Sequence, residues 1–63
     1  MSYYEIGLDR ATDVLGDKER AVDWLEKMSA AFGKSPQEIL LDQDGLDRVL
    51  RHLHSIELAL NTD

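Results

Sequence analysis

The side chains best suited to chemistry gather near the end of the chain, where His52, His54, Ser55 and Glu57 follow one another closely. The surrounding apolar pattern is helical, so His52 and His54, two residues apart, point to different faces and make a poor pair of metal ligands. Ser55 follows His54 directly, and neighbours on a helix diverge, so the serine has no positioned base. We therefore predict that both histidines are exposed or lie at the rim of the core, and that none of these residues is catalytic or a metal ligand.

Two short motifs elsewhere resemble ligand-binding loops. Gly33-Lys34-Ser35 repeats the end of a phosphate-binding loop, but Met28 stands where that motif requires its first glycine, and no strand precedes it. Asp42, Asp44 and Gly45 resemble the start of a calcium loop, but the bidentate glutamate is missing at the required distance. The sequence therefore predicts no cofactor, no metal and a protein that is not an enzyme.

Length and charge narrow the class further. The chain has 63 residues, no cysteine, and a formal net charge of -6 from 13 acidic and 7 basic residues. We expect a single domain over residues 1–63 that does not bind nucleic acid by itself, because its charge repels phosphates. Without a disulfide framework, a signal segment or an apolar run long enough to span a bilayer, the expected location is cytoplasmic. The acidity indicates either solvated helix faces or complementarity to a basic partner surface.

Apolar residues at helical spacing predict a first helix from Tyr4 to Leu15, which Gly7 weakens near its start. Gly16-Asp17 ends that helix and caps a second one, from Lys18 to about Met28. Trp24 in this second helix is either a core residue or an anchor for a ligand or partner. The expected inward stripe of the second helix is Ala21, Trp24, Leu25 and Met28.

A third helix is predicted by its capping box, in which Ser35 is the cap, Pro36 occupies the first helical position and Glu38 lies three residues after the cap. Phe32, in the preceding connection, is expected to tuck under the helices. Either Asp42 or Asp44 caps the last helix. Its apolar stripe is the longest in the chain and comprises Leu46, Val49, Leu50, Leu53, Ile56 and Leu60.

These elements predict an all-α fold, a small four-helix domain with a short third helix and a long C-terminal helix. The stripe from Leu46 to Leu60 exceeds what so short a chain can cover, so we expect a homodimer. The residues predicted to form the core or an interface are Trp24, Leu25, Pro36, Leu40, Val49, Leu50 and Leu53.

Several short motifs occur in a fixed order between Ala11 and Glu57. They are Gly16-Asp17, Trp24-Leu25, Phe32-Gly33-Lys34-Ser35-Pro36, Ile39-Leu40, Gly45, Val49, Leu53 and Ile56-Glu57. In this order they resemble the C-terminal toxin-binding domain of Xre/MbcA/ParS-type antitoxins. The resemblance implies a small helical domain that binds and neutralises a RES-type toxin, an enzyme acting on NAD.

Our hypothesis, given this resemblance, is steric inhibition, in which the last helix and its tail, Ile56 to Asp63, dock at or near the entrance of the toxin's active site and block substrate access. Leu58 and Leu60 would be apolar anchors, while Glu57 and Asp63 would meet a toxin Arg or Lys; Leu60 is alternatively the end of the core stripe. The implied partner-binding residues are Ile56, Glu57, Leu58, Leu60, Asn61, Thr62 and Asp63.

The chain departs from the family pattern in two places. Only Met1 to about Arg10 precedes the matching part, where such antitoxins carry a helix-turn-helix region, so DNA autoregulation is not implied. The pattern has a glycine shortly after Ile56-Glu57, but this chain continues with Leu58-Ala59-Leu60, which predicts a helix that runs on to Leu60. The alternative function is a stand-alone, homo-oligomerising interaction module with another protein partner.

Overall fold

Four helices follow one another in the computed structural model, which describes residues 2–61. They are α1 (Tyr3–Leu15), α2 (Lys18–Glu26), α3 (Pro36–Ile39) and α4 (Gln43–Leu60). No strand occurs within residues 2–61. The predicted all-α class, with a short third helix and a long last one, is confirmed.

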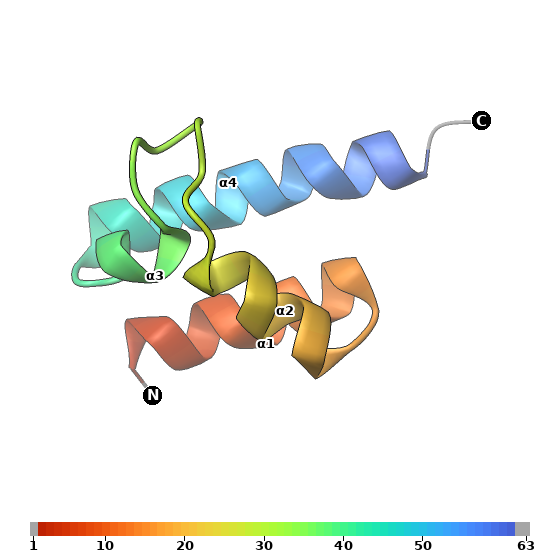
Figure 1. The fold of residues 1–63 in the computed structure, drawn as a ribbon, viewed down its shortest axis with the longest axis horizontal. Helices are drawn as coiled ribbons and strands as arrows, with labels where there is room; N and C mark the ends of the chain where they lie inside the picture. The colour runs from red at the N-terminus through yellow and green to blue at the C-terminus, as the bar shows by residue number, and fades with distance from the viewer. Residues whose placement is uncertain (1, 62–63) are drawn as a thin grey trace.

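The long helix α4 lies along one side of the molecule, and α1 and α2 lie along the other (Figure 1). α1 packs against both α2 and α4, and α3 joins α2 to the start of α4. The connection over residues 27–35 rises beside α4, while the C-terminal end of α4 extends beyond α1 and α2 (Figure 1). One end of α4 is thus held between neighbours, and the other end projects.

Side-chain caps begin α2 and α4 at the expected kinds of residue. The carboxylate of Asp17 accepts a hydrogen bond of 2.8 Å from the amide of Arg20, and that of Asp42 accepts one of 2.8 Å from the amide of Gly45. Of the two aspartates that could cap the last helix, Asp42 is therefore the one that does. Between α1 and α2, Gly16 adopts a left-handed conformation with φ of 96°, which residues with a side chain rarely adopt.

The second helix is shorter than its apolar pattern predicts. It ends at Glu26, because Lys27 has extended backbone angles and the chain leaves the helix there. Met28, expected on the inward stripe, is instead 77% exposed, so that part of the prediction is wrong. The following connection is closed by a hydrogen bond of 3.1 Å from the Ser29 amide to the Lys34 carbonyl, a turn-like pairing that helical periodicity does not register.

The core lies where the three longer helices meet α3. Gly7 of α1 belongs to this interior, because a Cβ there would lie 2.9 Å from Cδ1 of Leu40. The missing side chain thus lets Leu40 reach α1. The buried apolar residues are Ala11, Ala21, Leu25, Leu40, Leu46, Val49 and Leu53.

The chain covers the apolar stripe of α4 over most of its length. Leu46, Val49 and Leu53 are buried within the chain itself, whereas Leu60 is 64% exposed. Leu50 and Ile56 are half-buried, so the most exposed apolar side chain of this stripe is Leu60 at its end.

The backbones of α3 and α4 approach most closely at Gly45. A Cβ at this position would overlap the carbonyl oxygen of Ile39 and lie 2.7 Å from its carbonyl carbon. Backbone atoms cannot rotate away as the end of a side chain can, so only glycine allows α4 to start against α3.

We expect Gly45→Ala to destabilise the domain by about 3 kcal/mol or more, because either α3 or α4 has to move. Gly33→Ala is the matched control: Gly33 has φ of 74° but no atom within 4 Å of its missing Cβ, so only backbone strain of about 1 kcal/mol is added. Urea denaturation followed by circular dichroism measures both. Equal losses in the two variants would contradict the close approach.

The predicted capping box forms at the start of α3. The amide and the hydroxyl of Ser35 both donate to Oε2 of Glu38, at 2.8 and 2.7 Å. The hydroxyl and then the amide of Ser35 hold the pKa of Glu38 below its ordinary value of 4.5, and nearby Lys34 acts in the same direction. The folded state therefore favours the ionised carboxylate.

This depressed pKa predicts a pH-dependent contribution to stability. The contribution is present above the unfolded pKa, near 4.5, and disappears as the pH falls through the lower folded value. We expect the difference in melting temperature between the natural chain and Glu38→Ala to be larger at about pH 7 than at about pH 3. Glu38→Gln, whose side chain does not titrate in this range, is the control. A difference that is the same at both pH values would exclude the carboxylate as its source.

Candidate functional site

The projecting end of α4 presents apolar side chains to solvent. Leu58 is 57% exposed and Leu60 64%, and Ala59 between them is exposed as well. Ile56 is half-buried against the core, and Asn61 is the exposed C-cap of the helix. Thr62 and Asp63 lie outside the described residues. The helix runs to Leu60, as predicted from the absence of the glycine that the family pattern has shortly after Ile56-Glu57.

The apolar residues of this last turn do not lie on one face. Successive helical residues are about 100° apart, so Leu58 and Leu60 point in directions about 200° apart. Leu60 continues the stripe of Ile56, while Leu58 lies on nearly the opposite side. Apolar groups that point in opposing directions are suited to insertion between other elements rather than to lying on a flat surface.

Glu57 links this end of α4 to α1. Its Oε1 accepts a hydrogen bond of 2.8 Å from Nη2 of Arg10, and the two side chains are only 31% and 36% exposed. His54 approaches the same oxygen at 3.5 Å through Nδ1, and that contact is an ion pair only when the imidazole is protonated. The carboxylate expected to meet a toxin cation thus already has an intramolecular partner.

An aromatic cluster holds the middle of α4 against α2. The ring of His52 stacks on Trp24 with centroids 6.1 Å apart, and the ring of Phe32 meets His52 edge-on at 5.2 Å. His52 is therefore half-buried between two rings, while His54 is exposed. His52 is a rim residue with a packing role, and sequence reasoning missed that role because Phe32 comes from an irregular connection.

The residues predicted as core or interface divide into two groups. Leu25, Pro36, Leu40, Val49 and Leu53 are buried, whereas Trp24 and Leu50 are half-buried against them.

Ser55 makes its side-chain hydrogen bond within its own helix. The hydroxyl of Ser55 donates to the carbonyl of Arg51 on its own helix at 3.3 Å. Within the part of the chain that the structure describes, no group of three or more His, Asp or Glu side chains could hold a metal ion. No helix in the same part has the length and apolar character to cross a membrane.

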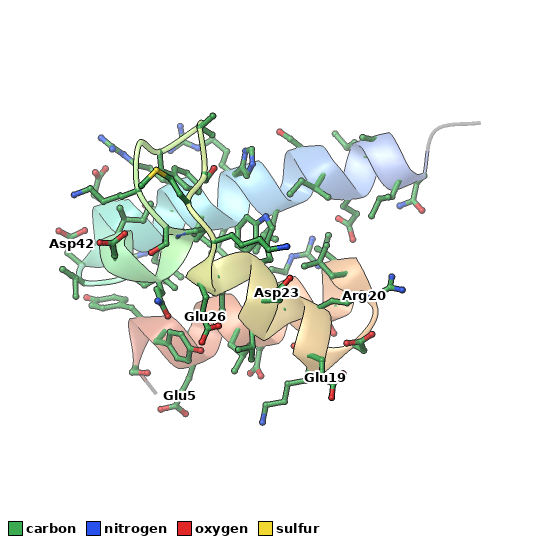
Figure 2. All side chains as sticks on the ribbon, viewed as in Figure 1. Glu5, Glu19, Arg20, Asp23, Glu26 and Asp42 are labelled. Atoms are coloured by element: carbon green, nitrogen blue, oxygen red, sulfur yellow. The ribbon has the colours of Figure 1, made fainter. Side chains whose placement is uncertain are left out.

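Charged side chains cover the opposite side of the molecule. Glu5 of α1 and Glu19 of α2 project along the lower edge of the view in Figure 2, away from α4, and Arg20 projects at the far end of α2. Exposed ion pairs here, such as Lys27 with Asp23 at 2.9 Å, are local contacts between residues three or four positions apart. This side has the features of a solvated surface.

An exposed apolar helix surface is one of the features through which proteins bind a groove on a partner. The sequence matches a family described as the antitoxin Xre/MbcA/ParS C-terminal toxin-binding domain over residues 10–57, most of the chain, and the chain belongs to this family. No curated protein matches the chain, and no solved structure matches it either. The predicted family is confirmed.

The structure gives a physical meaning to several residues of the matched segment. The matched segment begins at Arg10 and ends at Glu57, the two residues that form the ion pair between α1 and α4. Within it, Gly16 occupies the left-handed turn and Gly45 the close approach to α3. The exposed apolar residues Leu58 and Leu60 come after the matched segment.

We expect the Arg10–Glu57 pair to couple α1 to α4 by about 0.5–1 kcal/mol, because both partners are mostly shielded from solvent. A double-mutant cycle with Arg10→Ala and Glu57→Gln, measured by urea denaturation, gives this coupling energy. The same cycle at the more exposed pair of Lys27 and Asp23 is the control and is expected to give a smaller value. A larger coupling at the control pair would refute the proposed link.

Proposed function

We propose that this chain neutralises a RES-type, NAD-consuming toxin by placing the end of α4 and the residues after it at the entrance of the toxin's active site. Membership of a toxin-binding antitoxin family supports a toxin partner. The observation that carries the proposal is the last turn of α4, which projects past the matched segment with Leu58 and Leu60 exposed.

The proposed inhibition is steric. The last turn of α4 carries apolar groups in opposing directions, so it fits a cleft with apolar walls on two sides better than a flat surface. Covering Leu58 and Leu60 contributes about 1–2 kcal/mol each, because full burial of such a side chain contributes about 1.5–3 kcal/mol and both are already partly covered. A toxin cleft filled in this way is closed to substrate.

The charged contacts are assigned to the tail. Glu57 is held by Arg10, so a toxin cation that bound Glu57 would first have to displace that partner. We therefore assign to Asp63 the main contact with a toxin Arg or Lys, a group that otherwise meets the phosphates of NAD. Ile56, Asn61 and Thr62 complete the proposed binding segment.

The role proposed is binding and not catalysis, and the compartment proposed is the cytoplasm. The second candidate function is a stand-alone module that forms a homodimer through the same end of α4, which the exposure of Leu58 and Leu60 favours. Light scattering of the purified chain alone, at micromolar concentration, distinguishes this candidate from a monomeric antitoxin.

We expect Leu60→Asp to abolish neutralisation of a co-expressed RES-type toxin, because a charge then enters an apolar contact, and to weaken toxin binding by more than about tenfold. Leu41→Asp is the matched control: Leu41 is 78% exposed but lies between α3 and α4, at the far end of the last helix. Growth rescue and consumption of NAD by the toxin are the two readouts.

Circular dichroism of both variants shows whether they fold, which we expect since both side chains are exposed. Neutralisation by Leu60→Asp equal to that of the natural chain would contradict the assigned surface. Loss of neutralisation in both variants, with the fold intact, would place the contact elsewhere on the domain.

A further inference from the structure

A second surface, separate from the end of α4, is hollowed between α4 and the connection over residues 27–35. The hollow has a volume of about 400 Å³ and is open to solvent. Two residues of the connection form one wall, and four residues spaced along one face of α4 form the floor. They are Ala31, Phe32, Arg48, Arg51, His52 and Ser55, and we call this surface the Arg48–Ser55 groove.

The groove is held in shape from both sides. The wall is fixed by the Ser29 amide bonded to the Lys34 carbonyl and by Phe32, whose ring meets that of His52 at 5.2 Å. The floor is fixed because His52 also stacks on Trp24 of α2. A surface that is already ordered loses little conformational entropy when a partner binds.

The charge of the groove is opposite to that of the protein. The chain carries a net charge of -6, yet Arg48 and Arg51 lie one turn apart in the groove. Nε of Arg48 lies 3.3 Å from Oδ2 of the exposed Asp44, one turn earlier on the same helix. Within residues 2–61, no carboxylate lies in ion-pairing distance of Arg51. At least one guanidinium is therefore open to an external anion.

We propose that the Arg48–Ser55 groove binds an acidic peptide segment of a protein partner. Guanidinium groups pair with carboxylates through two parallel hydrogen bonds, and the rings of Phe32 and His52 offer apolar area beside them. From Arg48 to Ser55 the floor is about 10 Å long, which matches about three residues of extended peptide. Arginine and aromatic side chains together are typical of residues that dominate protein interfaces.

Other ligand classes fit the groove less well. Small-molecule sites enclose most of their ligand, whereas this hollow is open. A nucleic-acid strand would carry its phosphates past a chain whose net charge is -6, which repels them. A short acidic segment presents its carboxylates to the two arginines without covering the acidic sides of the molecule.

This inference goes beyond the proposed toxin inhibition, because the groove shares no residue with the segment from Ile56 to Asp63. A partner could occupy the groove whether or not the end of α4 enters a toxin. The two proposals therefore fail independently, and the test below uses no toxin.

The probe is an acetylated, amidated hexapeptide of alternating glutamate and alanine, titrated into the isotope-labelled chain and followed by amide NMR shifts. We expect shifts confined to Ala31, Phe32 and residues 48–55, and a change in the fluorescence of Trp24, which stacks on His52. Binding should weaken between about 50 and 200 mM salt, because the contacts are exposed charges.

Charge-matched double variants test the site. Arg48→Ala with Arg51→Ala should weaken peptide binding by at least about fivefold, because both guanidinium groups that pair with the peptide's carboxylates are lost. Lys18→Ala with Arg20→Ala removes the same charge from the exposed surface of α2 and should leave binding unchanged. Equal weakening in the two double variants would overturn the proposal, because net charge alone would then govern binding.

Two further titrations decide whether the groove recognises a peptide. Inorganic phosphate should not reproduce the shifts, and the corresponding lysine–alanine peptide should not bind. The same shifts with phosphate would show a general anion site, and shifts that map outside the groove would place the peptide elsewhere; either result overturns the proposal.

Discussion

The arrangement of this domain depends on the contact between the backbones of α3 and α4, where Gly45 lies against the carbonyl of Ile39. The contact sets where α4 begins and hence where its buried stripe, its groove and its projecting end lie. Asp42 caps the helix at the same place, because its carboxylate accepts a hydrogen bond from the Gly45 amide. The capping box of α3 precedes this junction and holds it from the other side.

The long helix α4 contributes to the core and to both of the proposed binding surfaces. One face of α4 is buried by α1, α2 and α3, a second face lines the Arg48–Ser55 groove, and the last turn projects past the other helices. Because α4 runs continuously from Gln43 to Leu60, these three parts are held in a constant register. The Arg10–Glu57 pair joins α1 to α4 just before the projecting last turn, inside the proposed binding segment.

The charge distribution fits a binding protein. Acidic side chains lie on α1 and α2, while two arginines lie together in the groove and apolar side chains lie at the end of α4. Family membership indicates a toxin as a partner of this chain. The Arg48–Ser55 groove lies before the end of α4 along the helix, so a second partner can contact the groove without covering that end.

The sequence by itself determined the elements of this protein and its family. Local signals encode the helices: Gly16-Asp17 ends one and starts the next, and the box of Ser35, Pro36 and Glu38 starts the third. The order of these motifs was enough to identify the family over residues 10–57. Only the tertiary structure decided the early end of α2, the exposure of Met28, the stacking of His52 between Trp24 and Phe32, and the pairing of Glu57 with Arg10. The stacking of His52 and the pairing of Glu57 arise from contacts between segments distant in the chain, which leave no periodic signal in the sequence, whereas caps and turns arise from neighbours and do.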